Sequence, residues 1–535
     1  MEPSRTLAQS IAVILAQNGV KRMFGVPGGG SSLDLIDAGA EHNIEFILCR
    51  TETSAALMAA VTGELTGVPG IVLTGIGPGA ASAVNGIAYA SLEKAPLIVF
   101  TDAHDIASPA PPHQIFDQQR LFQPISKAQK RLDPINSQSE FSALFHLALT
   151  EPPGPVHIDL SAKDARTAVK ETYDAAPPKQ STVGTKTSLE DAMSAVRAAR
   201  YPALIIGHQC RPTPRAAIAN KLANALGGPI MTTYKAKGVI SEDHKNYVGL
   251  FTGATLDGEV LSQADLIVFC GTDPVEMIGG EWLYDAPVCV LSETSGLEWP
   301  FKPKVEVGGA LTDSAAALVQ VETEVDWDGL KIQRKKEDRQ VKLKYSDTNL
   351  RSPDEIINSV SEAAPQNARL TVDAGAHMFS AMSLWPARAP FDVLKSNGLS
   401  TMGYAVPAAI ASWLEEPERP VIAVTGDGGM LMCLSELSTA ARLDANITVI
   451  VMNDAALSLI DIKQQRQQRA PAGVRYPRTD FATTARGMGL EAWTVGAQDP
   501  LEFALGEAID TDGPTLLDVS VDPTGYLEQM MALRG

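Results

Sequence analysis

Short apolar runs alternate with helical segments along most of the chain, and this alternation indicates the fold class. The runs are four to six residues long and end in glycine or polar turns, which is typical of buried strands. Strands that alternate with helices pair in parallel and carry helices on both faces. We therefore predict an α/β protein built from doubly wound parallel sheets. The predicted strands are 44–49, 71–74, 97–101, 156–160, 204–207, 229–233, 266–271, 288–291, 421–425 and 447–452.

Two polar stretches divide this pattern into three domains. Residues 173–188 contain Pro177-Pro178 and little apolar character, so we interpret them as a linker. Residues 325–351 are rich in charge and lack a long apolar stripe, so we interpret them as an exposed connecting helix. Acidic residues interleave its basic ones, which argues against a nucleic-acid patch. The predicted domains span 1–172, 189–325 and 352–535.

The third domain carries the most informative motif, Thr425-Gly426-Asp427-Gly428-Gly429 followed by Met452-Asn453-Asp454. The order is strand 421–425, acidic glycine turn, helix 430–443 and strand 447–452. Both turns then lie at the carboxyl ends of adjacent parallel strands, where open α/β sheets bind ligands. The glycines allow backbone N–H groups to approach an anion. Carboxylates beside an anion require a cation between them, and Mg²⁺ bridging a diphosphate satisfies both.

Composition narrows the classes of partner. The 535 residues are 45% hydrophobic and 20% charged, with a formal net charge of −19, so the chain lacks the basic face that nucleic-acid binding requires. No apolar run is long enough to span a bilayer, and the N-terminus lacks a secretory apolar region. The five cysteines are scattered and form no CxxC pair, which predicts buried, reduced thiols in a cytoplasmic protein.

A glutamate in the first domain is a second candidate for chemistry. Glu52 follows the predicted strand 44–49 and begins a helix of small residues. A carboxylate in the first helical turn is also favoured by the helix dipole alone, so this position has an ordinary structural explanation. Two glycine-rich turns, 25–30 and 75–79, lie in the same domain. The first of these turns lacks the G-x-G-x-x-G spacing with a ribose-binding acid, which argues against a nicotinamide dehydrogenase.

These motifs together resemble the thiamine diphosphate (ThDP) enzymes, in particular the branch of acetolactate synthases, pyruvate oxidases and 2-oxo acid decarboxylases. The resemblance implies an N-terminal pyrimidine-binding domain, a central domain and a C-terminal diphosphate-binding domain. Its motifs extend from about residue 20 to residue 460. The matching segments are Phe24 to Gly29, Arg50 to Ala60, Gly77 to Ala80, Gln114 to Asp117, Pro153 to Val156, Gly375 to His377, Gly398 to Tyr404, and the Asp427 and Asp454 turns.

The resemblance also implies roles for individual residues. Glu52 would move a proton at N1′ of the aminopyrimidine, and a dry site would raise its pKa. Met402 would support the bent cofactor, and the Ser400 carbonyl would accept from its amino group. Asp427, Asp454 and the Ala456 carbonyl would bind Mg²⁺. The other predicted cofactor contacts are Val26, Pro27, Gly28, Pro78, Ser82, Ala376, His377, Gly428 and Gly429.

The implied activity is decarboxylation of a 2-oxo acid with carboligation, as in acetolactate synthase. A non-ligating decarboxylase, a 2-hydroxyacyl C–C lyase and a non-catalytic ThDP-binding regulatory subunit are alternatives. Gln114 matches the glutamine of the ligating branch, whereas His113 replaces an aromatic residue there. Lys463 stands where acetohydroxyacid synthases have tryptophan; with Arg466 it would attract an anionic acceptor or form a solvated face.

The resemblance further implies a homodimer or homotetramer, in which Glu52 of one subunit and Asp427 of another serve one cofactor. The central domain has residues 232–238 near the family's usual T-T-x-x-x-K-G segment but no distinctive flavin signature. FAD is therefore possible but not expected. Neither nucleic acid nor membrane is an expected partner, and the expected substrate is a small 2-oxo acid or related carbonyl compound.

Overall fold

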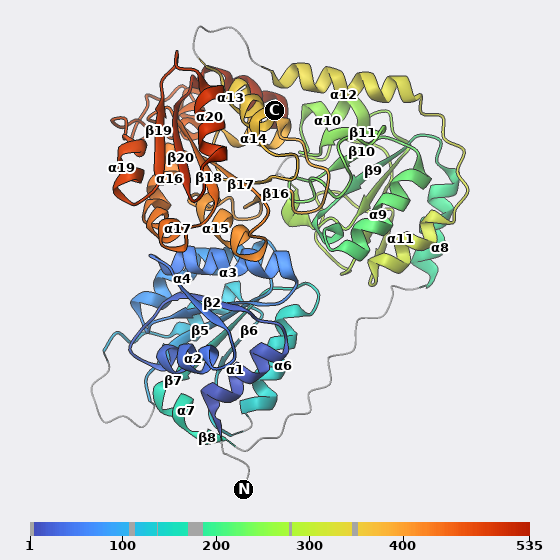
Figure 1. The fold of residues 1–535 in the computed structure, drawn as a ribbon. Coiled ribbons are helices and arrows are strands. Elements are labelled where there is room, and N and C mark those ends of the chain that lie inside the picture. The colour runs from blue at the N-terminus through green and yellow to red at the C-terminus, as the bar shows by residue number, and fades with distance from the viewer. Residues whose placement is uncertain are drawn as a thin grey trace. The chain divides into compact units, whose positions relative to one another are not determined.

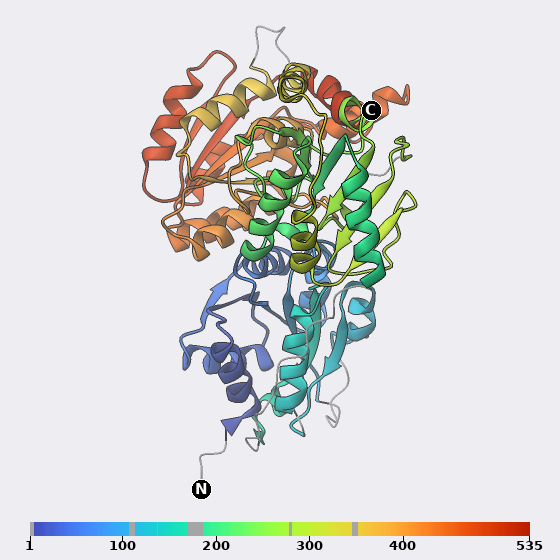
Figure 2. The same cartoon turned by 90° about the vertical axis from the view of Figure 1, so that its right-hand side faces the viewer.

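A computed structural model describes residues 5–105, 113–135, 137–169, 186–277, 281–344 and 351–534 (Figures 1 and 2). Contacts divide the chain into two compact units. The first comprises 1–180, 406–418 and 433–445, and the second comprises 181–405, 419–432 and 446–535. Most of the predicted linker, residues 173–185, lies outside the described residues. Each unit is described here by itself.

The first unit contains one six-stranded parallel sheet of order β3-β2-β4-β5-β7-β6. Helices α3 and α4 cover one face, and α1, α2, α6 and α7 cover the other (Figure 1). A short antiparallel pair, β1 (Arg5–Thr6) and β8 (Ala168–Val169), lies beside them. The sheet strands are β2 (Arg22–Val26), β3 (Glu45–Leu48), β4 (Gly70–Thr74), β5 (Leu97–Ala103), β6 (Ala128–Arg131) and β7 (Pro155–Ser161). The helices are α1 (Leu7–Gln17), α2 (Ser31–Ala40), α3 (Glu52–Thr66), α4 (Pro78–Leu92), α5 (Gln118–Phe122), α6 (Ser137–Leu149) and α7 (Ala162–Arg166).

The second unit contains two further parallel sheets, of which the first has the order β11-β10-β9-β12-β13-β14. Alternate residues of β9 enter different cores: Leu204 packs with α8, α9 and α11, and Ile205 packs with α10 and α12. This sheet is therefore buried on both faces, as a doubly wound sheet requires. The strands are β9 (Pro202–Ile206), β10 (Ile230–Thr232), β11 (Tyr247–Leu250), β12 (Leu266–Cys270), β13 (Val288–Ser292) and β14 (Val305–Gly308). The helices are α8 (Lys186–Ala198), α9 (Thr213–Leu226), α10 (Thr255–Leu261), α11 (Leu311–Val319) and α12 (Gly329–Leu343).

The other sheet of the second unit has the order β16-β15-β17-β18-β20-β19, again all parallel. Ile422 and Val424 of β17 point into a core that α13, α14, α20 and α21 complete. The three-domain α/β fold is confirmed. The strands are β15 (Arg369–Val372), β16 (Val393–Lys395), β17 (Val421–Gly426), β18 (Ile447–Asn453), β19 (Glu491–Val495) and β20 (Thr515–Ser520). The helices are α13 (Pro353–Ala363), α14 (Met378–Leu384), α15 (Ala405–Glu415), α16 (Asp427–Cys433), α17 (Leu437–Leu443), α18 (Ser458–Arg466), α19 (Phe481–Gly487), α20 (Leu501–Asp510) and α21 (Tyr526–Arg534).

Two predicted helices differ from those observed. The single helix expected over 430–443 begins at Asp427 and is broken by a 3₁₀ turn at Leu434–Glu436. The break turns the Glu436 carboxylate toward the backbone N–H groups of Arg50 and Thr51, which donate to it at 3.0 and 3.1 Å. Helix α12 is not wholly exposed, because Arg339 is buried and donates to Asp257 at 3.1 Å and to two carbonyl oxygens.

Two sequence expectations concern the cysteines and the length of the apolar segments. All five cysteines are free and buried. None of the helices in the described part of the chain combines the length and apolar character that a membrane span requires.

Candidate active site

Strand pairing brings the two acidic turns of the third predicted domain together. Strands β17 and β18 are parallel neighbours, with Gly426 opposite Met452. Asp427 begins α16 directly after β17, and Asp454 follows directly after β18. Both carboxylates therefore lie at the carboxyl edge of the same sheet, as the sequence predicted.

Asp427 is buried, and its two oxygens have different surroundings. Oδ1 accepts from the Gly428 N–H at 2.7 Å and from the Tyr476 hydroxyl at 3.0 Å. Oδ2 is buried without a hydrogen-bond partner among the described residues. Burial raises the pKa of Asp427, and the Gly428 and Tyr476 donors oppose that rise. A buried oxygen without a donor is suited to a bound cation.

Asp454 faces the same space with a strongly perturbed carboxyl group. Burial raises its pKa to about 6, and the Asp427 charge adds to the rise while the Ser458 hydroxyl, which donates to Oδ2, opposes it. A divalent ion between two carboxylates relieves their mutual repulsion. Among the described residues no group of three His, Cys, Asp or Glu side chains could hold a metal. The predicted third ligand is the Ala456 carbonyl, and Ala455 beside it has a left-handed backbone (φ 59°).

Glycines at 428 and 429 let neighbouring side chains pack directly against the backbone beside these carboxylates. A Cβ atom at Gly428 would lie 2.6 Å from Leu457 Cδ2, 3.2 Å from Tyr476 Oη and 3.3 Å from Met402 Cε. A Cβ at Gly429 would lie 2.3 Å from Asp373 Oδ2. Any side chain at these two positions would therefore collide with its neighbours. Met402 is one of the neighbours of Gly428.

His377 lies in the same region, behind the glycine turn. Its ring is so close to Gly375 and Gly426 that Cβ atoms there would lie 2.6 Å and 3.1 Å from it. The ring is buried, Nε2 has no partner among the described residues, and burial lowers the pKa of His377 to about 4. The neutral imidazole can therefore offer one ring nitrogen to a ligand. Ala376 is buried beside it, whereas Ser400 is exposed in a left-handed conformation (φ 51°).

Asp373 organises this half of the site, and sequence reasoning missed it. It is fully buried after β15 and accepts from the N–H groups of Gly403 at 2.9 Å and Tyr404 at 3.2 Å, directly after Met402. It also accepts from the Thr425 hydroxyl at 2.9 Å. Burial raises the pKa of Asp373 to about 6, and these donors oppose the rise. The only local signal was a polar residue at the end of an apolar strand.

Glu52 lies in the first unit, at the start of α3. Thr51 caps this helix, since its side chain accepts from the Ser54 N–H at 3.1 Å. The Glu52 side chain is half-buried, and Oε1 lies 3.2 Å from where a Cβ on Gly79 would be. Pro78 and Ser82 lie on α4, and the Ser82 carbonyl accepts from the Thr53 hydroxyl at 2.6 Å. Glu52 and the turn at Gly77 to Gly79 are therefore neighbours.

The two glycine turns of the first unit touch each other, and Asp102 holds one of them. A Cβ on Gly28 would lie 2.2 Å from Asp102 Oδ2 and 2.8 Å from Gly75 Cα. Asp102 accepts from the Gly30 N–H at 3.1 Å and the Ser32 N–H at 2.8 Å, at the N-terminus of α2. Val26, Pro27 and Gly28 thus lie on a turn that a buried carboxylate fixes, and Asp102 is a second residue that the sequence did not reveal.

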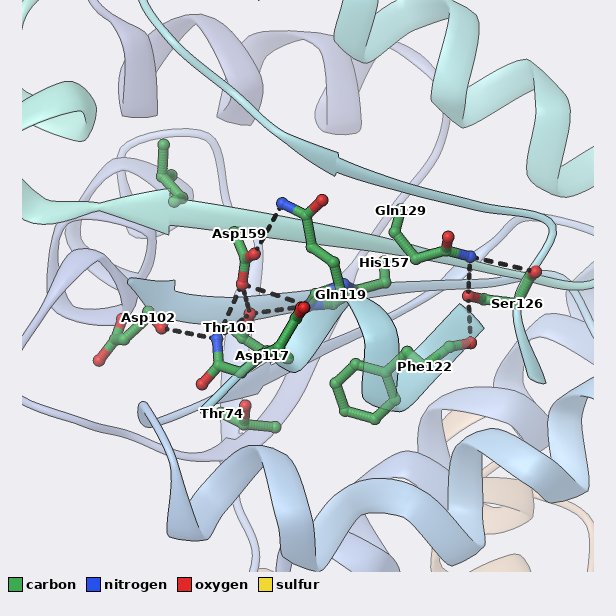
Figure 3. Close-up of polar contacts among 12 residues, drawn as sticks. Thr74, Thr101, Asp102, Asp117, Gln119, Phe122, Ser126, Gln129, His157 and Asp159 are labelled. Carbon is green, nitrogen blue, oxygen red and sulfur yellow. Dashed lines mark hydrogen bonds and ion pairs between the residues drawn. The ribbon is translucent and has the colours of Figure 1, made fainter. Parts of the chain in front are cut away.

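A buried polar network supports the other glycine turn. The Thr101 hydroxyl donates to Asp159 at 2.6 Å and lies 2.8 Å from Nε2 of His157 (Figure 3). Because its single hydrogen goes to Asp159, Nε2 of His157 must be protonated and donate to Thr101 Oγ1. Burial lowers the pKa of His157 to about 4, which keeps the ring neutral. Gln118 donates to Asp159 at 2.8 Å and accepts from the Gly77 N–H at 2.8 Å. The network therefore reaches the turn beside Glu52.

The predicted substrate residues His113 and Gln114 are exposed just before α5. The Gln114 carbonyl oxygen is 2.3 Å from where a Cβ on Gly77 would be, so the chain packs directly against the second turn. The backbone of Gln114 is left-handed (φ 57°). Predicted site residues thus form two groups, one around Glu52 in the first unit and one around Asp427 in the second.

Comparison with known proteins identifies the family. Models of the thiamine pyrophosphate enzymes match the chain three times: the N-terminal TPP binding domain over 5–124, the central domain over 189–310 and the C-terminal TPP binding domain over 373–519. The acetolactate synthase isozyme 1 large subunit of Escherichia coli is 30% identical, over 97% of this chain and 94% of that protein. The chain belongs to the thiamine pyrophosphate enzyme family. It is therefore a ThDP-dependent enzyme that forms or cleaves carbon–carbon bonds.

Other relatives of this ThDP enzyme match nearly the whole chain at similar identity. An acetolactate synthase of Bacillus subtilis is 28% identical over 96% of this chain and 93% of that protein. A probable 2-ketoarginine decarboxylase of Pseudomonas aeruginosa is 26% identical over 97% of this chain and 95% of that protein. The acetolactate synthase-like branch that the motifs indicated is confirmed.

Proposed function

We propose that this ThDP enzyme requires Mg²⁺ and decarboxylates a 2-oxo acid with transfer of the remaining acyl unit to a second carbonyl compound, as in acetolactate synthase. The observation that carries the proposal is the pair of carboxylates, buried Asp427 and half-buried Asp454, beside a turn where only glycine fits at 428 and 429. Two repelling carboxylates at the start of a helix suit a Mg²⁺–diphosphate unit.

The same residues fit the cofactor's diphosphate end. Asp427 Oδ2, Asp454 and the Ala456 carbonyl would hold Mg²⁺, while Gly428 and Gly429 N–H groups and the neutral His377 ring would contact the diphosphate. Ala376 would border it. ThDP supplies a thiazolium carbon that adds to a carbonyl and accepts the electrons released with CO₂. The remaining chemistry falls to side chains of this chain.

Those side chains place and move protons. Glu52 would exchange a proton with N1′ of the aminopyrimidine and so make the adjacent amino nitrogen a base. Met402, next to Gly428, would support the ring from below, and the exposed Ser400 carbonyl would accept from the amino group. The turns that contain Val26, Pro27 and Gly28, and Pro78 and Ser82, would surround the pyrimidine. His113 and Gln114 would face the substrate carboxylate.

A decarboxylase that does not ligate is the second candidate. The relative named as a probable 2-ketoarginine decarboxylase favours it, and so does Lys463 in place of the tryptophan of acetohydroxyacid synthases. A 2-hydroxyacyl lyase would use the same residues in the reverse direction. Gln114, which matches the ligating branch, favours carboligation.

We propose three domains, pyrimidine-binding (1–172), central (189–325) and diphosphate-binding (352–535), in a homodimer or homotetramer with sites shared between subunits. FAD in the central domain is possible but not expected. At its topological switch point, between β9 and β12, a Cβ on Gly207 would lie 2.2 Å from Thr272 Cα. Glu276 accepts from the His208 N–H there.

Product analysis tests the activity. Purified protein would be incubated with ThDP, Mg²⁺ and a panel of 2-oxo acids, alone and in pairs, and the products identified by mass spectrometry. Acetohydroxy acids or other acyloins together with CO₂ are expected. Release of CO₂ with aldehyde alone would replace the proposal with the non-ligating decarboxylase.

A further inference from the structure

Residues 455–476, which we term the α18 loop, leave the sheet directly after Asp454 and return beside it. The Leu457 N–H donates to the Val474 carbonyl at 2.8 Å, and the Tyr476 N–H donates to the Ala455 carbonyl at 3.2 Å. Ala456 and Arg475 form an antiparallel bridge between them. These contacts close the neck of the loop, so that the backbone of Tyr476 is tied to the residue next to Asp454.

The closed neck places one hydroxyl on each candidate metal ligand. Tyr476 donates to Asp427 Oδ1 at 3.0 Å, and Ser458, at the start of α18, donates to Asp454 Oδ2. Asp427 Oδ1 also accepts from Gly428 N–H, while Oδ2 has no partner among the described residues. The Tyr476 hydroxyl and the Gly428 N–H therefore both donate to Oδ1 of Asp427, and Oδ2 is left for a cation.

The Tyr476 hydroxyl is suited to remain a donor. A protonated phenol can only donate its hydrogen to a carboxylate. The hydroxyl also lies close to Gly428, where a Cβ would be 3.2 Å from Oη.

We propose that Tyr476 is a positioning residue for the metal: its hydroxyl fixes Asp427 so that Oδ2 faces the cation, and it couples closure of the α18 loop to metal binding. The proposal rests on the metal site of the proposed function. By linkage, a cation that binds the aligned carboxylate stabilises the closed neck, and the closed neck favours the cation by the same factor. Partners that orient a metal ligand contribute about 10–100-fold to metal affinity.

The test compares Tyr476→Phe, which removes one oxygen atom, with Tyr201→Phe as the matched control. Tyr201 is a partly exposed tyrosine of the second unit whose ring packs against Trp327. The free Mg²⁺ concentration for half-maximal thermal stabilisation would be measured at saturating ThDP, and Mn²⁺ binding would be followed by electron paramagnetic resonance. Tyr476→Phe is expected to need about tenfold more of either ion, with the melting temperature of the metal-free, ThDP-free protein unchanged.

The variant Asp427→Ala distinguishes failure of the proposed role of Tyr476 from failure of the proposed metal site. If Asp427→Ala abolishes the Mg²⁺ requirement for stabilisation but Tyr476→Phe matches wild type, the metal site holds and the role of Tyr476 is overturned. If Asp427→Ala itself behaves as wild type, the metal site fails and the proposal fails with it. A lower melting temperature without any change in Mg²⁺ or Mn²⁺ affinity would make Tyr476 structural only and would also overturn the proposal.

Discussion

Replacement of Gln118 by leucine should loosen the glycine turn beside Glu52. Gln118 accepts from the buried Gly77 N–H at 2.8 Å and donates to Asp159 at 2.8 Å. Leucine fills a similar volume but leaves that N–H without an acceptor and removes one donor from a buried carboxylate. Each loss costs about 1–3 kcal/mol, and with each taken near the lower end of this range their sum is about 3 kcal/mol.

This energy should appear locally rather than in a global melt, because a chain of several domains does not unfold in one step. Hydrogen exchange read by mass spectrometry on a peptide that contains Gly77 measures local opening. At 1.4 kcal/mol per tenfold change, exchange of this peptide should accelerate about a hundredfold. Turns in the second unit should be unaffected.

The neighbouring residue provides a matched control. Gln119 is half-buried and makes one bond to the same carboxylate, to Asp159 Oδ2 at 3.0 Å (Figure 3). Gln119→Leu should cost about 1 kcal/mol and leave the Gly77 peptide close to wild type. Equal exchange of that peptide in Gln118→Leu, Gln119→Leu and wild type would refute the view that Gln118 holds the turn.

Four further outcomes are expected. Glu52→Gln should bind ThDP yet exchange its C2 proton orders of magnitude more slowly, as followed by NMR, because an amide cannot transfer the proton at N1′; a wild-type rate would assign activation to another group. Mg²⁺ affinity, from calorimetric titrations, should fall about tenfold per pH unit below about 6, where the raised pKa of Asp454 keeps a proton that metal must displace. The metal-free protein should instead lose the Asp454 contribution to stability as pH rises from the unfolded value near 3.8 to about 6, because only the folded state holds the proton there. Mixed Glu52→Gln and Asp427→Ala subunits should regain about one intact site in two, since one interface then carries both defects; no recovery despite subunit exchange would place each site within one chain.

The alternation of apolar runs and helical segments was sufficient to predict parallel sheets and the placement of Asp427 and Asp454 at one sheet edge, but not the strands β15, β16, β19 and β20 of that sheet. Both depend on local patterns: a buried strand reads as an apolar run, and parallel neighbours place their end turns together. The predicted strand 447–452 is β18 (Ile447–Asn453), for example, and it pairs with β17 as expected.

The residues that hold the site in shape were not predictable in this way. Asp102, Asp373 and Gln118 act through partners 30 or more residues away, and no periodicity marks such contacts. The same is true of Arg339, which is buried against Asp257. It is also true of the helix break at Glu436, whose carboxylate accepts from the backbone N–H of Arg50. Tertiary contacts override local propensity at such positions.

The central claim is that Asp427 and Asp454 hold ThDP through a divalent cation. Isothermal titration of the purified, cofactor-free protein with ThDP tests it, in Mg²⁺ and in a chelator, for wild type and Asp427→Ala. Tight binding is predicted only for wild type with Mg²⁺, because the carboxylates otherwise repel the diphosphate. Equal affinity with the chelator, or in Asp427→Ala with Mg²⁺, would contradict the account.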